Sequence, residues 1–178
     1  MEMYSEELRA KARKISWFFT DVDGTLTDGQ VYYGANGEAL KAFSLRDGSG
    51  VFLLKQAGIK FGIITGEESP IVEQRAKKLK VDKLLMNAVP KVEILTHFLE
   101  SENLSLENVA FIGDGINDVK LLKAAGLGFA VNDAHSLAKE NADIICTNNG
   151  GNGAFLEAVE ILLNLRGESV QDIIESKL

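Results

Sequence analysis

The feature that most constrains this chain is an apolar segment that ends abruptly in carboxylates. Residues 15–19 read Ile-Ser-Trp-Phe-Phe, and Asp21, Asp23 and Gly24 follow directly. A largely apolar run of this length is typical of a buried strand in a parallel sheet. Open sheets of this kind bind ligands beyond the carboxyl ends of their strands. The segment therefore predicts an α/β fold in which Asp21 and Asp23 lie side by side at the ligand-binding edge.

Strand-like and helix-like segments alternate along the rest of the chain. Strands are predicted over residues 15–19, 60–66, 83–86, 109–112, 128–131 and 143–145. Helices are predicted over residues 1–14, 51–56, 70–80, 90–103 and 154–165, with one ending at 125 and one starting at 135. This alternation indicates βαβ units with right-handed connections, and hence a Rossmann-like parallel sheet with helices on both faces. No linker or repeat interrupts the pattern, so we expect a single domain over residues 1–178.

One segment departs from the alternation. Residues 31–43 contain β-prone residues on both sides of Asn36-Gly37, a pair that favours a type I′ turn, so a β-hairpin is predicted. Residues 45–50 are predicted to form a polar loop, and Gly58 is placed to end the helix that follows it. The tail after Gly167 is polar with a weak apolar pattern, and no element is assigned to it.

Composition excludes several classes of function. The net charge of −7 argues against a nucleic-acid or anionic-membrane partner. Cys146 is the only cysteine, which permits no internal disulfide and fits a reducing, cytoplasmic location. No apolar run approaches the roughly 20 residues that span a bilayer, and the charged N-terminal segment has no signal-peptide core.

Groups suited to phosphate chemistry are predicted at the carboxyl ends of the strands and the start of one helix. They are Asp21, Asp23, Thr65, Lys91, Asp114 and Asp118. Carboxylates that converge need a cation, and oxygen-only ligands favour a hard ion such as Mg²⁺. A lysine and a hydroxyl beside carboxylates and Mg²⁺ suit a phosphoryl group. A carboxylate can attack phosphorus, and a second one can transfer the proton.

These residues resemble the four motifs of the haloacid dehalogenase (HAD) superfamily. The motifs stand as Asp21–Thr25, Thr65-Gly66, Lys91 and Gly113–Asp118. The resemblance implies that Asp21 is the nucleophile and forms an aspartyl phosphate, and that Asp23 is the general acid/base. It further implies an Mg²⁺ ion held by Asp21, Asp114 and the backbone carbonyl of Asp23. Thr65 and Lys91 would hold phosphoryl oxygens, while Asp118, with Asn117 beside it, would orient these groups.

A narrower resemblance, to the 3-deoxy-D-manno-octulosonate 8-phosphate (Kdo 8-phosphate) phosphatases of lipopolysaccharide precursor synthesis, covers nearly the whole chain. It rests on segments 27–29, 43–48, 63–66, 75–76 and 150–154 and on the Tyr-rich hairpin. The resemblance implies an enzyme without a cap domain that forms a homotetramer. The candidate residues for binding the substrate are Arg46, Gly66, Glu67, Arg75 and Lys78.

Two residues depart from that family's pattern. Glu67 stands where an arginine is frequent and, with Lys78, looks more like the related phosphatases of nonulosonate (sialic acid or KDN) 9-phosphates. Gly115 stands where an aspartate is usual. The 9-phosphate is therefore the alternative substrate.

Other interpretations remain open at the level of sequence. A receiver domain also phosphorylates an aspartate with Mg²⁺, but Asp23 would shorten the life of such a phosphoryl group. A binding module without catalytic activity would keep the same fold but would not carry out the reaction. Arg46 and Arg75 are alternatively solvent-facing, and the loop 150–153 either binds anions through its backbone or is only flexible.

Overall fold

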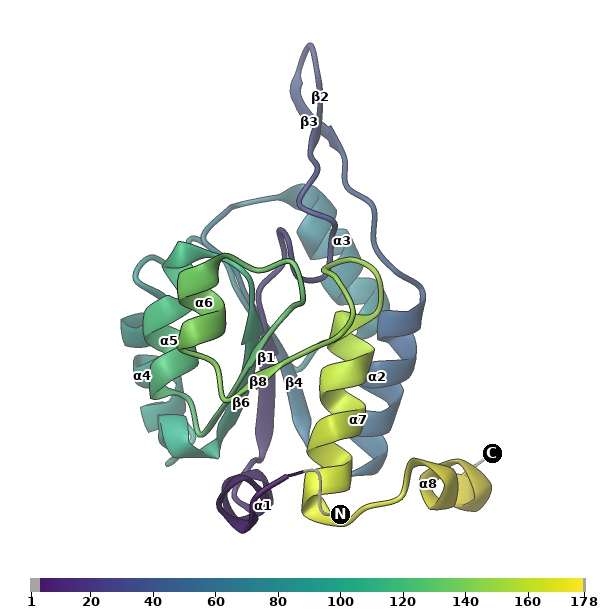
Figure 1. Cartoon of the computed structure of the whole chain (residues 1–178). Helices are drawn as coiled ribbons and strands as arrows, with labels where there is room; N and C mark the ends of the chain where they lie inside the picture. Colours follow the sequence, from purple (N-terminus) through teal and green to yellow (C-terminus); the bar gives the residue numbers. More distant parts are fainter. Residues whose placement is uncertain (1–3, 178) are drawn as a thin grey trace.

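A six-stranded parallel sheet forms the centre of the structure, a computed structural model that describes residues 4–177 (Figure 1). Its strands are β1 (Trp17–Thr20), β4 (Lys60–Ile64), β5 (Lys83–Leu85), β6 (Val109–Gly113), β7 (Leu127–Ala130) and β8 (Ile144–Ile145). They lie in the order β5-β4-β1-β6-β7-β8, with β1 paired to both β4 and β6. The predicted α/β fold is confirmed. The central position of β1 explains its apolar sequence, since helices cover both of its faces.

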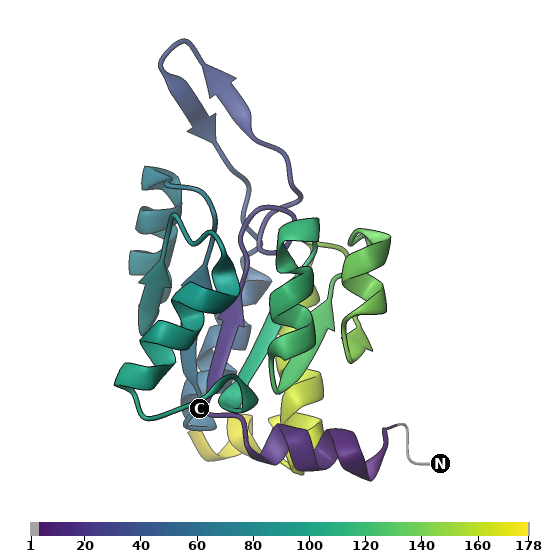
Figure 2. The same cartoon turned by 90° about the vertical axis from the view of Figure 1, so that its left-hand side faces the viewer.

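Helices cover the two faces of this sheet (Figure 1). On one side lie α4 (Lys91–Ser101), α5 (Val119–Ala124) and α6 (Ser136–Glu140), and on the other lie α2 (Arg46–Gln56), α3 (Pro70–Leu79) and α7 (Ala154–Arg166). Short 3₁₀ turns at Leu106–Asn108 and Ile116–Asp118 precede β6 and α5. Two further helices, α1 (Glu6–Arg13) and α8 (Val170–Lys177), lie at the amino ends of the strands, away from the hairpin (Figure 2). In the described residues, no helix is both long and apolar enough to cross a membrane.

The core is built from aromatic and aliphatic side chains on both sheet faces. Phe18 of β1 stacks on Phe129 of β7, with ring centroids 5.8 Å apart, and meets the edge of Phe155 of α7 at 5.4 Å. Trp17 and Phe19 stack on each other at 5.2 Å. All five side chains are 3% exposed or less. Burial on this scale anchors β1, so its carboxyl end is a rigid support for the residues that follow.

The predicted hairpin is present and projects beyond the carboxyl ends of the strands (Figures 1 and 2). It consists of β2 (Tyr32–Gly34) and β3 (Gly37–Leu40). The predicted type I′ turn at Asn36-Gly37 is wrong. The pairing of Gly34 with Gly37 puts Ala35 and Asn36 at the centre of the turn, and neither has the positive φ that a type I′ turn needs. Gly37, with φ of 107°, instead follows the two central residues of the turn. Hairpins with longer loops also place a residue of positive φ directly after the turn.

The predicted polar loop at residues 45–50 is also wrong, because α2 already begins at Arg46. Glycines at 48 and 50 disfavour a helix, but tertiary packing overrides this preference. A Cβ atom on Gly50 would lie 2.8 Å from Cε1 of Phe155, so the missing side chain lets α2 approach α7 closely. Gly58, with φ of 71°, follows the end of the helix as expected.

The two ends of the chain differ from the prediction in different ways. The helix predicted over residues 1–14 begins at Glu6, where the Ser5 hydroxyl accepts a hydrogen bond from the amide of Leu8, and residues 1–3 lie outside the described range. The tail, to which no element was assigned, contains α8, whose Val170 and Ile173 pack against the core. Burial of these two side chains stabilises a helix that its own sequence favours only weakly.

Candidate active site

The carboxyl ends of β1, β4 and β6 surround a pocket of about 240 Å³. Its lining residues are Asp21, Asp23, Thr65, Gly66, Glu67, Asp114 and Asn117. The parallel sheet thus brings together, across more than 90 residues of sequence, side chains that were predicted to meet. Lys91 joins them from the start of α4, where its ammonium group contacts Asp21.

The loop after β1 is shaped so that its carboxylates face the loop after β6. The amide of Asp21 donates to the carbonyl of Ile112 at 3.0 Å, which extends the sheet by one residue. Gly24 then turns the chain with φ of 86°, and a Cβ atom there would lie 2.2 Å from Oδ2 of Asp114. The hydroxyl of Thr25 donates to Oδ1 of Asp114 at 3.1 Å. Glycine at position 24 is therefore required both for the turn and for the approach of Asp114.

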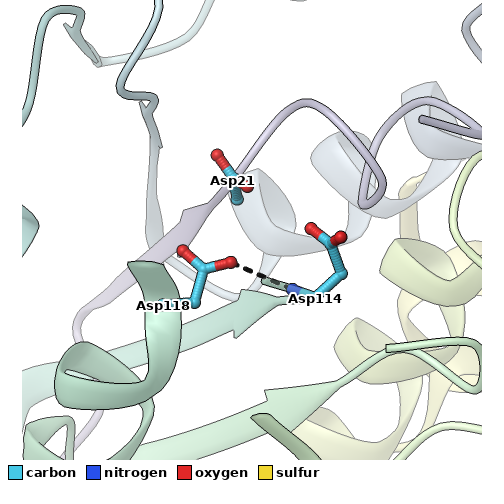
Figure 3. Close-up of side chains that lie close together, drawn as sticks. All are labelled: Asp21, Asp114 and Asp118. Atoms are coloured by element: carbon cyan, nitrogen blue, oxygen red, sulfur yellow. Dashed lines mark hydrogen bonds between the residues drawn. The ribbon is translucent and has the colours of Figure 1, made fainter. Parts of the chain in front are cut away.

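Lys91 links the carboxylates of Asp21 and Asp118 through two ion pairs. The Lys91 ammonium lies 2.7 Å from Oδ1 of Asp21 and 2.6 Å from Oδ1 of Asp118. The other oxygen of Asp118 accepts a hydrogen bond from the amide of Asp114, at 3.0 Å (Figure 3), and another from the amide of Gly115, at 2.9 Å. Both carboxylate oxygens of Asp118 are thus engaged, which suits a residue that orients Lys91 and the β6 loop.

Burial changes the protonation of the carboxylates in this cluster. Burial, opposed by the charge of Lys91 and reinforced by the charge of Asp118, raises the pKa of Asp21 to about 7. Burial also raises the pKa of Asp114 to about 6, with Asp118 adding to the effect and the Thr25 hydrogen bond reducing it. The positive charge of Lys91 therefore does not offset the effect of burial on these two carboxylates. A bound cation would lower both pKa values and keep the carboxylates ionised at neutral pH.

The residues present fit a divalent cation bound by oxygens. Asp21, Asp114 and Asp118 each offer a carboxylate oxygen, and these oxygens lie within 4.8 Å of one another (Figure 3). Three carboxylates face a single ammonium group, that of Lys91, which leaves an excess of two negative charges. Because Asp118 is already engaged, Asp21 and Asp114 are the better ligands. A set of hard oxygen ligands with this charge suits Mg²⁺.

Asp23 is held by a part of the molecule that the sequence did not indicate. Its Oδ1 lies 2.6 Å from the ammonium of Lys41, which follows β3 and whose side chain is 1% exposed. Lys41 also lies 3.0 Å from Oε1 of Glu38, whose other oxygen accepts a hydrogen bond from the Ser69 hydroxyl. Burial lowers the pKa of Lys41, but its hydrogen bonds to Asp23 and Glu38 outweigh burial and raise it overall. No local pattern marks these residues, because only the fold brings the hairpin to Asp23.

Thr65 and Glu67 lie where the sequence predicted. Thr65 is 2% exposed, and its hydroxyl oxygen accepts a hydrogen bond from the amide of Glu67 at 3.2 Å. The bend after β4 thereby turns Gly66 and Glu67 into the pocket, and Asn117 lines it from the β6 side.

Three predicted substrate residues do not line this pocket in the single chain. Arg75 and Lys78 line a neighbouring groove of about 390 Å³ between α2 and α3. Arg75 donates to the carbonyl of Ser44 at 2.7 Å, and its guanidinium lies 5.2 Å from the centre of the Phe43 ring. Arg46 is exposed at the start of α2, next to Gly153. Their assignment to the substrate stays a prediction.

The glycine-rich loop before α7 supports the loop after β1. The amide of Gly151 donates to the carbonyl of Thr25 at 2.9 Å, and the amide of Gly150 donates to Oδ1 of Asp133 at 2.9 Å. The amide of Asn152 is bound to the carbonyl of Asn149. These amides already have partners within the chain, which argues against the anion-binding interpretation of residues 150–153.

Comparisons with known proteins agree with this geometry. A family model described as haloacid dehalogenase-like hydrolase matches residues 83–157. The 3-deoxy-D-manno-octulosonate 8-phosphate phosphatase KdsC of Haemophilus influenzae is 36% identical over 91% of this chain and 90% of its own length. KdsC of Escherichia coli K12 is 38% identical over 92% of this chain and 87% of its own length.

Solved structures extend the likeness to three dimensions. The crystal structure of the phosphatase of the same name from Moraxella catarrhalis, in complex with magnesium, phosphate and KDO, has a TM-score of 0.91 and 35% identity, covering 98% of this chain and all of that one. The cobalt-bound enzyme from H. influenzae has a TM-score of 0.85 and 34% identity, covering 92% of this chain and 99% of that one. The chain belongs to the haloacid dehalogenase-like hydrolases and, among them, to the family of the 3-deoxy-D-manno-octulosonate 8-phosphate phosphatases.

Proposed function

We propose that this protein hydrolyses Kdo 8-phosphate to Kdo and phosphate, a step of lipopolysaccharide precursor synthesis, through an aspartyl-phosphate intermediate. The observation that carries the reaction type is the pocket in which Asp21, fixed by Lys91, lies beside Asp23 and Asp114. Relatives named for this reaction, at 36–38% identity over most of the chain, support the choice of substrate.

In the first step, Asp21 acts as the nucleophile. A carboxylate oxygen of Asp21 forms a bond to phosphorus while the bond from phosphorus to the sugar oxygen breaks. Asp23, in its protonated form, donates a proton to the departing sugar oxygen, which leaves as the alcohol. Lys91 and the Thr65 hydroxyl hold the phosphoryl oxygens, since both flank Asp21.

In the second step, the same residues release phosphate. Asp23, now a carboxylate, takes a proton from water, whose oxygen attacks phosphorus. The bond between phosphorus and Asp21 breaks, which restores the Asp21 carboxylate and frees inorganic phosphate. The carboxylates of Asp21 and Asp114 and the backbone carbonyl of Asp23 would hold Mg²⁺, which would supply positive charge to offset the repulsion between the anionic phosphoryl group and the nucleophile.

The sugar would be bound at the mouth of the pocket, where the hairpin and the exposed residues around it lie. We assign Gly66 and Glu67 from the pocket wall, and Arg46, Arg75 and Lys78 from the adjoining surface, to recognition of the sugar acid. Arg75 and Lys78 line a groove that is separate from the pocket of their own chain. These two cations would therefore act at the pocket of a neighbouring subunit. A cytoplasmic homotetramer is the assembly proposed.

A second substrate, a nonulosonate 9-phosphate, is favoured by one observation. Glu67 lines the pocket beside Asp21 and Asp23, where it adds a carboxylate close to the position of the phosphate. An acidic group there repels an anionic sugar carboxylate and accepts hydrogen bonds from sugar hydroxyls instead. This favours a longer substrate whose own carboxylate lies further from the pocket.

Steady-state kinetics with both substrates would test the proposal. Purified protein with Mg²⁺ is expected to give a higher kcat/KM for Kdo 8-phosphate than for KDN 9-phosphate or N-acetylneuraminate 9-phosphate. Exhaustive chelation should abolish phosphate release and added Mg²⁺ should restore it, while excess Ca²⁺ should inhibit because its coordination sphere is larger and looser. A reversed preference would assign the 9-phosphate, and full activity after chelation would contradict the metal-dependent mechanism.

A further inference from the structure

The base of the hairpin contains a partly buried series of polar contacts that ends on Asp23. Ser69, the residue that caps α3, donates to Glu38 of β3. Glu38 contacts the Lys41 ammonium at 3.0 Å, and Lys41 contacts Oδ1 of Asp23 at 2.6 Å. These contacts connect the hairpin, which projects from the body of the fold (Figure 1), to a residue that lines the pocket.

Lys41 is unusual because its charged group is withdrawn from water. Its side chain is 1% exposed, whereas the side chains of Glu38 and Asp23 are 21% and 28% exposed. A buried ammonium is retained only where carboxylates compensate for its lost hydration. Here the compensation comes from both sides, so the position of Lys41 depends on Glu38 and on Asp23 together.

The two oxygens of Asp23 differ as a result. Lys41 engages Oδ1, while Oδ2 is buried and has no hydrogen-bond partner among the described residues. A buried carboxylate oxygen without a partner is uncommon and costs stability. It is expected where the partner is a substrate or a water molecule, and Asp23 lines the pocket in which that partner would lie.

We infer that Lys41 is a positioning residue that fixes the Asp23 carboxylate so that Oδ2 is the oxygen that transfers the proton, with Glu38 and Ser69 orienting Lys41. The inference rests on the proposed phosphatase reaction, in which Asp23 serves as acid and then as base. Without the contact to Lys41, the carboxylate could rotate about its χ torsions, and the fraction of time spent in the productive orientation would fall. Substrate binding involves other groups and should change little.

The test compares variants in two substrates that differ in their need for a proton. The variants are Lys41→Met, which removes the charge, Lys41→Arg, which keeps it, and Glu38→Gln, which weakens the support of Lys41. Lys14→Met is the matched control, because Lys14 and Glu107 form an exposed ion pair 3.4 Å apart. Kdo 8-phosphate has a sugar alkoxide as leaving group, which needs a proton, whereas p-nitrophenyl phosphate releases a stable phenolate, which does not.

Lys41→Met is expected to lower kcat for Kdo 8-phosphate about 100-fold, the lower end of what acid–base catalysis contributes, with KM changed less than about threefold. In rapid mixing with p-nitrophenyl phosphate, the same variant should show a fast release of one equivalent of nitrophenolate per site. The turnover after this release should be slow, because with p-nitrophenyl phosphate only the second step, the hydrolysis of the aspartyl phosphate, needs Asp23. Lys41→Arg should recover activity to within about tenfold of wild type, and Glu38→Gln should show the same pattern as Lys41→Met in a milder form.

Three results would overturn the inference. One is a Lys41→Met enzyme within a factor of about two of wild type on Kdo 8-phosphate. Another is an equal loss in the first step with both substrates, which indicates damaged folding. The last is a Lys41→Arg variant no better than Lys41→Met. If Lys41→Met fails to fold, Glu38→Gln decides by the same criteria. A wild type that is inactive on Kdo 8-phosphate but active on another alkyl phosphate would refute only the proposed substrate, and the comparison is then made on that alkyl phosphate.

Discussion

At the scale of single residues, the carboxylates of the site differ in their partners. Asp21 shares the Lys91 ammonium with Asp118, at 2.7 and 2.6 Å. Asp118 has both carboxylate oxygens engaged, whereas the carboxylate of Asp114 accepts a hydrogen bond from the Thr25 hydroxyl at one of its two oxygens. These partners are brought together by the ends of β1 and β6 and the start of α4. In the proposed mechanism, the same residue type would therefore serve as nucleophile, metal ligand or support according to its place.

We expect Asp21→Asn to abolish turnover, because an amide is a poor nucleophile, and Asp23→Asn to lower kcat at least about 100-fold. Both variants should keep the overall fold, because asparagine has the shape of aspartate and the partner lysines keep Glu38 and Asp118 as ion-pair partners. Phosphate release under saturating substrate and Mg²⁺ would measure the loss, with circular dichroism as the check on folding. An Asp23→Asn enzyme within a factor of about two of wild type would refute its role in proton transfer.

Asp47, at the start of α2, gives a second prediction at this scale. It is 1% exposed, and its Oδ2 has no hydrogen-bond partner among the described residues. Burial raises the pKa of Asp47 from 3.8 to about 7, although the charge of Arg75 opposes the effect. Between these values the folded state binds more protons than the unfolded state. The contribution of Asp47 to stability is therefore full below about pH 4 and is lost as the pH rises to about 7.

Asp47→Asn removes this dependence. The free energy of unfolding of the variant, relative to wild type, should increase by about 2 to 3 kcal/mol between pH 5 and pH 8. Urea denaturation of both proteins at the two pH values would measure it, and the exposed Asp172→Asn serves as a surface control that should differ little from wild type at either pH. If the difference in unfolding free energy between Asp47→Asn and wild type stays constant with pH, the pKa of Asp47 is not raised in the folded protein.

At the scale of elements, close packing decides where α2 begins. Gly48 and Gly50 both lie within the helix, but only Gly50 faces α7, where a Cβ atom would meet Phe155 at 2.8 Å. At Gly48, no heavy atom of the described residues lies within 4 Å of such a Cβ atom, apart from the adjacent residues and the nearby backbone of α2 itself. The same residue type therefore has two different effects in one helix, a cost in propensity at one position and a packing requirement at the other.

Replacing each glycine by alanine separates these effects. Gly48→Ala should stabilise the protein by about 0.5–1 kcal/mol, because alanine favours the helix and meets open space. Gly50→Ala should destabilise it by about 1–3 kcal/mol, because the new methyl group forces α2 away from α7. Thermal unfolding of the two variants in parallel provides the measurement, and each is the control for the other. A Gly50→Ala variant as stable as Gly48→Ala would mean that the helices readjust without cost.

At the scale of the whole molecule, the hairpin is the feature that a single chain leaves incomplete. Tyr32, Tyr33 and Leu40 are 59%, 76% and 65% exposed, on an isolated pair of strands. A lone two-stranded hairpin is marginal in water, and its open edges invite pairing with another chain. Packing between the hairpins of several subunits would bury these side chains and bring a neighbouring surface over each pocket.

We therefore predict that the protein sediments as a homotetramer at micromolar concentration. The double variant Tyr33→Ser, Leu40→Ser should dissociate, and its kcat/KM for the sugar phosphate should fall with the fraction of assembled protein. Ile145→Ser, which changes an exposed apolar residue of β8, is the control and should stay assembled. A fully active monomer would remove both the assembly and the contribution of a neighbour to the site.

What the sequence by itself determined is the part of the molecule governed by local patterns. The apolar run before Asp21 predicted the buried strand β1, and the alternation of strands and helices predicted the parallel sheet. A parallel sheet collects the carboxyl ends of its strands at one edge, so the meeting of Asp21, Thr65 and Asp114 in one pocket followed as well.

Only the tertiary structure decided the features that depend on contacts distant in sequence. The close approach of α2 to Phe155 occurs at Gly50, and α8 packs the partly buried Val170 and Ile173 against the core. The contact between Lys41 and Asp23 depends on how the hairpin leaves and rejoins the body of the protein. A local sequence pattern reports which face of a segment is apolar, but not which partner it meets. Packing and the pairing of buried charges select that partner once the chain is folded.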